Sequence, residues 1–410
     1  MRILILTPTA LPSVTGNAMT VERWRWSLTE RNCSVQVFAT EDDQVSELLE
    51  CLDVFQPDIL HVHHAFRAGS LLSDSRIAPR IRNLPVVVSP GGTDINLDVE
   101  RDDRREIVAA TFRRARLILL QSEEMATRLL ELFPDFRDRI TAVPKGLRWL
   151  GDEPYSLRGI MGCRPENILF FLPAGIRPVK GNLECLSAME DVYRVRPTVR
   201  ILFAGPALDP DYAVKFEKRI HGLSRFARWI PSIPPQSMRS AYAGADVVLN
   251  TSFSEGLSNS LLEAIASGKP VLASNIPGNH WPVLGEDGGE RAGVLFEPDD
   301  PEDFIRKALG LIDDGDLRES LARAGLKRAA FGLSREKEAE GLLAAFKVAL
   351  GLTDRQTLPS SKSVESPPGL TVYKTEGETY QRLHLCDDLR DLPELSGNQP
   401  GDPSIKKGKV

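Results

Sequence analysis

The chain has 410 residues, of which 42% are hydrophobic and 26% are charged, the balance of a globular protein with room for two or three domains. Its 51 basic and 57 acidic side chains give a formal net charge of −6. This charge argues against a dedicated nucleic-acid binder, because such proteins owe much of their affinity to neutralised phosphates. Five scattered cysteines without a C-x-x-C pair predict neither a disulfide framework nor a structural zinc site.

The N-terminus carries an apolar run at residues 3–6 that ends at Thr7 and Pro8. Such a run is too short for the apolar region of a signal peptide and is typical of a buried first strand. No stretch of the chain approaches the roughly 18 apolar residues that a membrane-spanning helix needs. We therefore expect a soluble protein of the cytoplasm.

Short apolar runs alternate with amphipathic stretches along residues 1–150. This alternation predicts right-handed βαβ units on a parallel sheet that helices cover on both faces. The expected strands are residues 3–6, 35–38, 59–62, 86–88 and 117–120, and the expected helices are residues 18–31, 43–55, 104–112 and 123–132.

A stretch rich in glycine and proline at residues 148–166 interrupts this pattern, which then begins again. Two α/β halves joined by one linker predict two doubly wound domains that face a cleft. Ligands of such sheets bind beyond the carboxyl ends of the strands, so we expect the functional site in that cleft. In the second half the expected strands are residues 168–172, 199–203, 247–249 and 271–273, and the expected helices are residues 183–193, 212–221, 259–267 and 301–312.

The C-terminal part of the chain changes character twice. Residues 317–331 and 335–350 read as amphipathic helices made of good helix formers. From residue 353 onward proline, serine, glycine and charged residues dominate, which predicts a mostly disordered tail.

The most informative motif is NTSFSEGLSNSLLEAIASGKPVLAS, residues 250–274. Glu255 lies in a loop after an expected strand, and Glu263 lies about 7.5 Å along a helix that begins near Ser258. The backbone at Gly256, Leu257 and Ser258 then forms a helix N-terminus, which attracts anions. One segment can therefore offer a carboxylate on each side of a bound diphosphate, although an ordinary capped helix with a buried carboxylate would carry the same residues.

With these flanking residues, the pair of glutamates resembles the motif of glycosyltransferase family 4, the retaining group 1 glycosyl transferases of the GT-B fold. The resemblance covers roughly residues 1–350. It implies that Glu255 contacts hydroxyl groups of the donor sugar and that Glu263 contacts the ribose of the nucleotide. The fold that it implies is α/β, with two Rossmann-like doubly wound domains facing a cleft, a C-terminal crossover helix and a disordered tail.

The resemblance also assigns roles to the parts of the chain. We expect the acceptor on the first domain and the nucleotide sugar on the second. The expected boundaries are residues 1–150 for the N-terminal acceptor-side domain, 151–334 for the C-terminal nucleotide-sugar-binding domain, 335–352 for the crossover helix and 353–410 for the tail.

A second motif, FLPAGIRPVKGN at residues 171–182, brings Arg177 and Lys180 to the end of an expected strand. An arginine and a lysine together can hold one anion, the first as a planar fork and the second as a point charge. The family uses such a pair to hold the donor diphosphate, although its spacing is longer than R-x-x-K. Two solvated cations on a loop are the alternative.

Two loops of the first half complete the expected site. Gly16 and Asn17 precede a helix, where the family often has a Gly-Gly that contacts phosphate, although a plain turn would look the same. In VVVSPGGTDIN, residues 86–96, Gly91 stands where many relatives have a histidine, so we expect no catalytic histidine there. Asp94 would bind an acceptor hydroxyl or cap the turn that follows.

Three histidines cluster in HVHH, residues 61–64. Strand alternation puts His61 and His63 on one face and His64 on the other. His63 is a candidate for acceptor contact, with structural packing or a metal site as alternatives, but no carboxylate or cysteine lies at ligand spacing. The resemblance implies chemistry that needs neither a metal nor a cofactor.

The implied function is a metal-independent retaining transfer of a hexose from a nucleotide diphosphate sugar, with a UDP- or GDP-sugar favoured. The acceptor would be a hydroxyl on a glycan, a lipid-linked molecule or a small molecule. The motifs TGN, GGTDIN, AGIRPVKG and SNIPGN resemble the glycosyltransferase-1-domain-containing branch, with the selenosugar synthases as neighbours. The alternatives are a sugar phosphorylase, an epimerase, a thio- or selenosugar synthase, or a nucleotide-sugar-binding protein without catalysis.

Contact with the inner face of a membrane is a further hypothesis. Arg113, Arg114 and Arg116 with Trp24 and Trp26 could face lipid headgroups. A solvated helix face and tryptophans in the core would explain the same residues. We expect no nucleic-acid partner.

Overall fold

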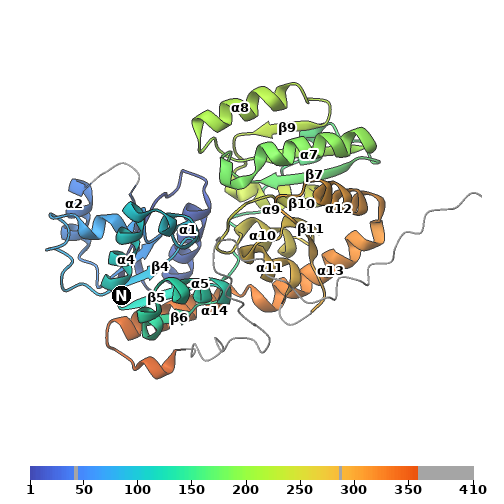
Figure 1. Ribbon diagram of the computed structural model, residues 1–410. Coiled ribbons are helices and arrows are strands. Elements are labelled where there is room, and N and C mark those ends of the chain that lie inside the picture. Colours follow the sequence, from blue (N-terminus) through green and yellow to red (C-terminus); the bar gives the residue numbers. More distant parts are fainter. Residues whose placement is uncertain (41–44, 286–288, 359–410) are drawn as a thin grey trace, which may run out of the picture. The chain divides into compact units, whose positions relative to one another are not determined.

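The computed structural model describes residues 1–40, 45–285 and 289–358 (Figure 1). Within these residues the strands form two six-stranded sheets, in which the neighbouring strands run parallel. The first has the order β2-β1-β3-β4-β5-β6 and the second the order β12-β11-β10-β7-β8-β9. Both belong to one contiguous unit, Met1–Val364.

The strands of the first sheet are β1 (Arg2–Thr7), β2 (Ser34–Ala39), β3 (Ile59–His63), β4 (Val86–Ser89), β5 (Leu117–Leu120) and β6 (Ile140–Ala142). Those of the second are β7 (Ile168–Pro173), β8 (Val199–Ala204), β9 (Ala227–Ile230), β10 (Val247–Asn250), β11 (Val271–Ser274) and β12 (Gly293–Phe296). The edge strands β6, β9 and β12 were not predicted.

The helices of the first lobe are α1 (Gly16–Thr29), α2 (Val45–Phe55), α3 (Thr93–Asn96), α4 (Asp102–Arg114) and α5 (Glu123–Leu132). Those of the second lobe are α6 (Leu157–Met161), α7 (Asn182–Val195), α8 (Pro210–His221), α9 (Met238–Gly244), α10 (Asn259–Ala266), α11 (Pro277–Leu284), α12 (Pro301–Asp313) and α13 (Gly315–Gly332). The last helix, α14 (Arg335–Ala349), returns to the first lobe.

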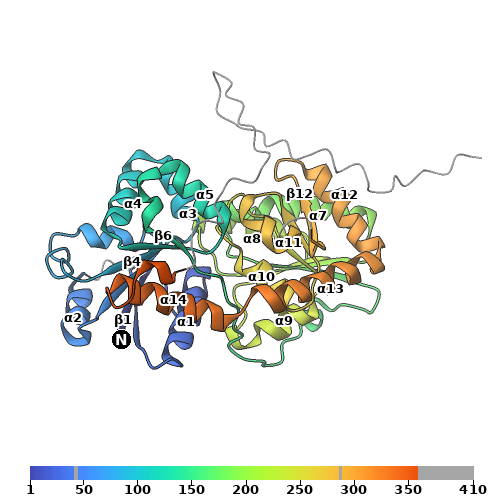
Figure 2. The same ribbon diagram turned by 90° about the horizontal axis from the view of Figure 1, so that it is seen from below.

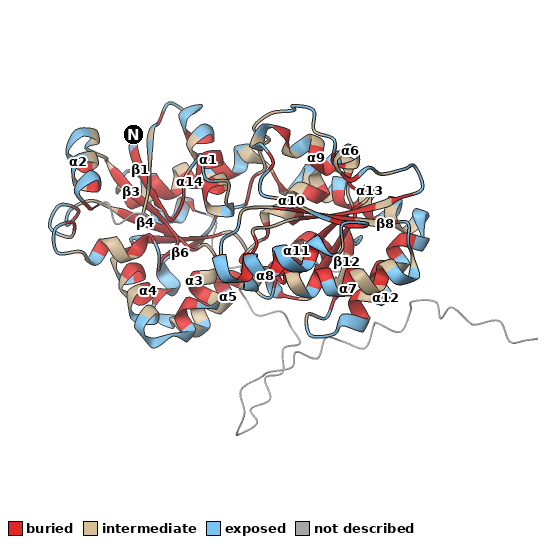
Figure 3. Ribbon diagram, turned by 90° about the horizontal axis from the view of Figure 1, so that it is seen from above, coloured by how far each residue is buried: buried red, intermediate tan, exposed pale blue. Residues whose placement is uncertain are grey.

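Strand β1 explains why these apolar runs became strands of a covered sheet. Ile3 and Ile5 point into a core that α1 and α14 complete, whereas Leu4 and Leu6 point into a core with α2, α4 and α5. A parallel sheet buried on both faces needs apolar residues at successive positions, which is why the run is continuous rather than alternating. Figure 3 shows the inner strands of both sheets as buried, whereas the edge strand β2 is partly exposed.

The crossover helix α14 lies beside α1 on the first sheet (Figure 2). Leu342, Ala345 and Phe346 pack with Trp24 of α1 in one core. The fold class expected from the sequence is therefore confirmed: two Rossmann-like sheets with flanking helices and a C-terminal crossover. No helix in the described part of the chain is both long and apolar enough to span a bilayer.

Two expectations meet different outcomes at the C-terminus and on the surface. The described chain continues past residue 353 to Leu358, which is buried in the core of the first lobe, while residues 359–410 of the expected tail lie outside the described residues. Trp24 is 1% exposed and so cannot face lipid headgroups, contrary to the membrane-contact hypothesis. Trp26 is exposed, but the guanidinium of Arg148 lies 4.9 Å from the centroid of its ring.

Candidate active site

A cavity of about 470 Å³ lies where loops at the carboxyl ends of both sheets meet. The first lobe contributes the loops after β1, β3 and β4, and the second contributes those after β7, β8 and β10. Most of the residues predicted for the site line it: Gly16, Asn17, His63, Arg177, Lys180, Glu255, Gly256, Leu257, Ser258 and Glu263. Of the predicted site residues, Asp94 does not.

Lys180 and Glu255 form an ion pair at the wall of this cavity. The ammonium Nζ of Lys180 donates to Oε1 of Glu255 at 2.6 Å, and the same oxygen accepts hydrogen bonds from Ser252 Oγ at 2.7 Å and Asn250 Nδ2 at 3.1 Å. Burial opposes ionisation of the carboxyl, but Lys180 and these hydrogen bonds outweigh it and lower the pKa of Glu255. Glu255 is therefore a carboxylate whose Oε1 is fully engaged.

Arg177 begins the short turn that carries Lys180, and its guanidinium has an unmet demand for an acceptor. Its Nε is buried and makes no hydrogen bond within the described residues. Burial lowers the pKa of Arg177, opposed by the charge of Glu255. A buried donor without a partner is costly, so an anion in this cavity would stabilise the arginine.

Glu263 lies on α10, the helix that follows the loop of Glu255. Burial raises the pKa of Glu263, with the nearby Tyr242 hydroxyl acting in the opposite direction. Ser258, the N-cap residue of α10, accepts a hydrogen bond from Asn250 Nδ2 at 2.9 Å and does not cap the helix with its side chain. The positive end of α10 is thus available to a ligand in the cavity.

The two lobes touch along the same loops. The backbones of Gly92 and Gly256 approach so closely that a Cβ added at Gly92 would lie 2.5 Å from the Gly256 nitrogen. Asn259 Nδ2 donates to the carbonyl oxygen of Gly16 at 3.2 Å, and Asn96 Nδ2 donates to that of Glu255 at 3.1 Å. The position of Glu255 therefore depends on contact with the first lobe.

Lys145 is a site residue that the sequence analysis missed. Its ammonium is buried, lines the cavity and donates to the carbonyl oxygen of Leu257 across the lobes at 2.7 Å. Burial lowers the pKa of Lys145 to about 7, helped by the charge of Arg23 and opposed by Glu338, Glu255 and Glu263. Its only sequence signal was the segment VPKG at residues 143–146, which carries no hint of what the side chain would meet.

Gly16 and Asn17, expected just before a helix, are the first two residues of α1, and both line the cavity. The side chain of Thr15 caps this helix, because its Oγ1 accepts a hydrogen bond from the backbone N–H of Ala18 at 3.2 Å. This cap engages the backbone N–H of Ala18. Gly16 and Asn17, the two residues before Ala18, line the cavity.

His61 and His63 share one face of β3, as the alternation predicts, because both contact Trp24. The ring of His61 stacks on Trp24 at 4.8 Å between centroids, and that of His63 meets it edge-on at 5.1 Å. Burial lowers the pKa of each histidine to about 3. His63 lines the cavity as a neutral ring, whereas His61 packs in the core.

Asp94 is buried beneath the cavity wall, and its position does not support contact with an acceptor. Its carboxylate accepts hydrogen bonds from the backbone N–H groups of Ala65 at 2.6 Å, Gly92 at 2.9 Å and Gly91 at 3.1 Å. These bonds shape the loop after β4 and join it to the loop after β3. Of the two expectations for Asp94, the structure favours the structural one.

In the same loop, a side chain at Gly91 would meet crowded surroundings. A Cβ at Gly91 would lie 3.0 Å from Cδ2 of His64 and 3.6 Å from Oδ1 of Asn17. The imidazole of His64, held by a 3.0 Å hydrogen bond to Thr93 Oγ1, occupies the adjoining space. Within the described residues, no group of three histidine, cysteine or acidic side chains could hold a metal ion.

Two parallel sheets of this topology, with the cavity between their carboxyl ends, have the architecture of the GT-B fold. Residues 166–314 match the family model described as Glycosyl transferases group 1, and residues 43–148 match Glycosyltransferase Family 4. With one match on each lobe, the chain belongs to the group 1, family 4 glycosyltransferases. The resemblance that the motifs carry is thereby confirmed.

Among curated proteins, the chain is similar to "Glycosyltransferase 1 domain-containing protein 1" of Xenopus tropicalis, with 25% identity over 329 residues that cover 78% of this chain and 90% of the relative. Among solved structures, sucrose-phosphate synthase of Thermosynechococcus elongatus has a TM-score of 0.70 at 16% identity, covering 86% of this chain and 100% of that chain. Anabaena HepE in complex with UDP-glucose has a TM-score of 0.69 at 18% identity, covering 85% and 99%. At these identities the two structures support the fold alone.

Proposed function

We propose that this protein transfers a hexose from a nucleotide diphosphate sugar to an acceptor hydroxyl, with retention of the anomeric configuration. The observation that carries the proposal is the cluster of Arg177, Lys180 and Glu255 in the cavity. Glu263, eight residues after Glu255 in the sequence, lines the same cavity. UDP- and GDP-sugars are the favoured donors, and the likeness to a protein solved with UDP-glucose supports testing uridine first.

In this proposal the donor lies against the second lobe. Glu263 accepts hydrogen bonds from the ribose, and the backbone at Gly256–Ser258 holds the diphosphate at the positive end of α10. Arg177 and Lys180 offset the charge of the departing nucleotide, which is the work that a metal ion performs in other transferases. Glu255 accepts a hydrogen bond from a hydroxyl of the sugar through its second oxygen.

The geometry favours attack on the same face that the nucleotide leaves. Oε1 of Glu255, the carboxylate next to Lys180, already accepts three hydrogen bonds, which makes it a poor nucleophile. We therefore assign the acceptor's proton to an oxygen of the leaving phosphate, with charge separation held by Arg177 and Lys180. Contact between the lobes, as at Gly92 and Gly256, would limit the access of water to the donor and thereby its hydrolysis.

The proposal assigns residues 1–150 to the acceptor, 151–334 to the nucleotide sugar and 335–352 to the crossover. His63 is the acceptor-side candidate that lines the cavity. Its ring is neutral at physiological pH because burial lowers its pKa to about 3, so it would act by hydrogen bonding rather than by charge.

The first experiment is a thermal-shift panel of UDP, GDP, ADP and TDP with their sugar conjugates, on wild type and on Glu263→Ala. We expect one nucleotide class to stabilise the wild type, and the shift to be lost in the variant. A shift that survives in Glu263→Ala would contradict the site, and a wild type that responds to none of these nucleotides would favour a role other than donor-dependent transfer.

Catalysis is tested with the donor identified in that panel, first with water as acceptor. Lys180→Met and Arg177→Gln should each lower turnover by about a hundredfold or more, whereas Lys215→Met, an exposed lysine on α8, should not. Proton NMR of the first sugar released should show the donor's own anomer, and excess EDTA should leave the rate unchanged. Wild-type turnover in Lys180→Met, or the opposite anomer, would overturn the mechanism.

Binding without turnover would support a nucleotide-sugar-binding protein, and sugar 1-phosphate formation with inorganic phosphate would indicate a phosphorylase.

A further inference from the structure

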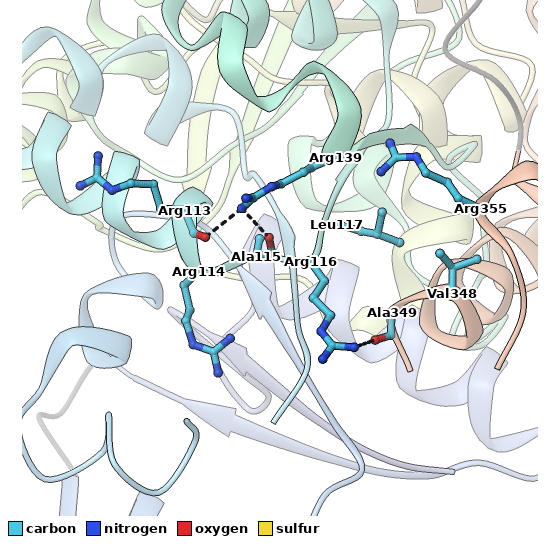
Figure 4. A pocket seen from close by; sticks show the side chains of 9 residues that line it. All are labelled: Arg113, Arg114, Ala115, Arg116, Leu117, Arg139, Val348, Ala349 and Arg355. Atoms are coloured by element: carbon cyan, nitrogen blue, oxygen red, sulfur yellow. Dashed lines mark hydrogen bonds between the residues drawn. The ribbon is translucent and has the colours of Figure 1, made fainter. Parts of the chain in front are cut away.

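Five arginines line a second cavity, of about 460 Å³, on the first lobe (Figure 4). Arg113 and Arg114 end α4, Arg116 precedes β5, Arg139 precedes β6, and Arg355 follows α14. The other lining residues, within the part of the chain that the structure describes, are apolar: Ala115, Leu117, Val348 and Ala349. Three separate stretches of the chain thus bring arginines to one hollow that contains no acidic residue.

Backbone carbonyl groups hold four of these five arginines in place. Arg139 Nη1 donates to the carbonyl oxygens of Arg113 at 2.9 Å and Ala115 at 3.2 Å, and Arg116 Nη1 donates to that of Ala349 at 2.7 Å (Figure 4). A carbonyl orients a guanidinium but does not neutralise it. Each guanidinium has five N–H donors, and these bonds use one nitrogen of each.

The same holds for two more of the five arginines. Arg114 Nη2 donates to the carbonyl oxygen of Leu84 at 2.9 Å, and Arg355 Nη2 donates to that of Ile140 at 3.0 Å. Burial lowers the pKa of Arg114, with a further contribution from the charge of Arg116. The positive charges of Arg114 and Arg116 therefore oppose one another.

Counter-charge is scarce around the hollow. Arg113 pairs with Glu106, but Arg114, Arg116, Arg139 and Arg355 form no ion pair with a carboxylate of a described residue. This concentration of positive charge stands on a chain whose formal net charge is −6. A polyanion would remove the repulsion between oriented guanidinium groups, which bind phosphate oxygens through paired, charge-assisted hydrogen bonds.

The hollow is separate from the candidate active site. Arg116 and Arg139 lie just before the amino ends of β5 and β6, whereas the active-site cavity lies beyond the carboxyl ends of the strands. The two cavities share no lining residue. A ligand in the hollow would therefore contact neither Arg177 nor Lys180.

We propose that this arginine pocket binds a small ligand that carries two or more phosphate groups. Its volume suits a small molecule, and its arginines come from enough directions to hold more than one phosphate. The ligand could be a free polyphosphorylated metabolite or the phosphorylated headgroup of a lipid, since both present the same chemistry to the pocket.

The test is a calorimetric titration of the full chain with tripolyphosphate, which measures the affinity. The variants are the double substitution Arg116→Gln/Arg139→Gln and the single substitution Arg355→Gln, which lies beyond the last helix. The matched control is Arg323→Gln, an exposed arginine on α13. Arg177→Ala identifies any tripolyphosphate that binds in the active-site cavity instead.

We expect binding to wild type, to Arg323→Gln and to Arg177→Ala, and affinity lowered about tenfold or more in both pocket variants. If the double variant does not fold by circular dichroism, Arg355→Gln decides. Equal affinity in the pocket variant that folds, loss of binding in Arg177→Ala, or no binding by the wild type would each overturn the proposal.

Vesicle co-sedimentation separates the two sources of phosphate. Vesicles of phosphatidylcholine with phosphatidylinositol 4,5-bisphosphate are compared with vesicles of phosphatidylcholine in which phosphatidylserine supplies the same total negative charge. Binding to the first alone, lost in Arg355→Gln, would support a lipid headgroup, and binding to neither, with tripolyphosphate bound, would support a free ligand. Equal binding to both would overturn recognition of phosphate in favour of simple attraction to negative charge.

Discussion

The ammonium of Lys145 donates a 2.7 Å hydrogen bond to the carbonyl oxygen of Leu257. This bond joins the segment after β6 to the loop that leads into α10. This bond joins the two lobes within the cavity where Glu255 and Glu263 lie. Because the pKa of the buried Lys145 is lowered to about 7, the charge at this junction changes near neutral pH.

Lys145 should make the free energy of unfolding depend on pH. The folded chain loses the proton of Lys145 near pH 7, whereas the unfolded chain keeps it to about pH 10.4. Between these values the unfolded chain binds more protons, so this group makes stability rise with pH, by at most about 1.4 kcal/mol per pH unit. Urea titrations from pH 7 to 9.5 should show a shallower rise in Lys145→Met than in wild type. Lys215→Met is the control, and an unchanged slope in Lys145→Met would contradict the assignment.

Gly92 should be intolerant of any side chain. Its φ is +105°, and a Cβ would lie 2.5 Å from the nitrogen and 2.6 Å from the Cα of Gly256. Gly92→Ala must push away the loop that carries Glu255, so we expect kcat/KM for transfer to fall about a hundredfold, since displacements near 1 Å have that effect. Gly162→Ala is the matched control, because Gly162 has φ +61° with no atom within 4 Å of its Cβ position. That variant should lose a little stability but no activity, and equal activity in both variants would contradict the prediction.

Glu338 should be essential for stability. Its buried carboxylate accepts hydrogen bonds from Arg23 Nε at 2.8 Å and Trp24 Nε1 at 2.9 Å, which joins α14 to α1. Glu338→Ala leaves Arg23 charged and buried, which should lower the free energy of unfolding by about 3–5 kcal/mol. Chemical denaturation measures the change, with the exposed Glu340→Ala as control.

A double variant separates pairing from packing at this position. In Arg23→Met/Glu338→Met no charge is left without a partner, so the loss should be smaller than the sum of the two single losses. If the losses of the single variants Arg23→Met and Glu338→Met add up to the loss of the double variant, Arg23 and Glu338 do not stabilise the fold through their mutual interaction.

The buried histidines should make the fold sensitive to acid. The pKa values of His61 and His63 are lowered to about 3, against about 6.5 in an unfolded chain. Between pH 6.5 and 3 the unfolded chain binds protons that the folded chain does not, so stability falls as the pH falls through this window. Melting temperatures measured over this range should decline less steeply in His61→Leu than in the exposed control His221→Gln. Parallel curves would show that His61 does not contribute.

Much of the fold could be predicted because its causes are local. The apolar run at residues 3–6 is continuous because β1 is covered on both faces, and this continuity can be read without knowing what covers it. The same applies to Glu255 and Glu263, since a strand end, a glycine and a helix start set their separation along the chain. These local features predict that both glutamates lie near one ligand, and both line the same cavity.

Only the tertiary structure decided what the chain's distant parts do to one another. Lys145 lies in a segment without a distinctive pattern, and its low pKa results from burial against the second lobe. The role of Asp94 depended on whether the N–H groups of Ala65 and Gly92 would surround it, and the crowding at Gly91 depended on where His64 would pack. The arginines of the second cavity are more than two hundred residues apart at their extremes, Arg113 and Arg355. Periodicity reports how a residue relates to its own helix or strand, whereas burial, pKa and charge clustering depend on contacts between distant segments that form only when the chain is folded.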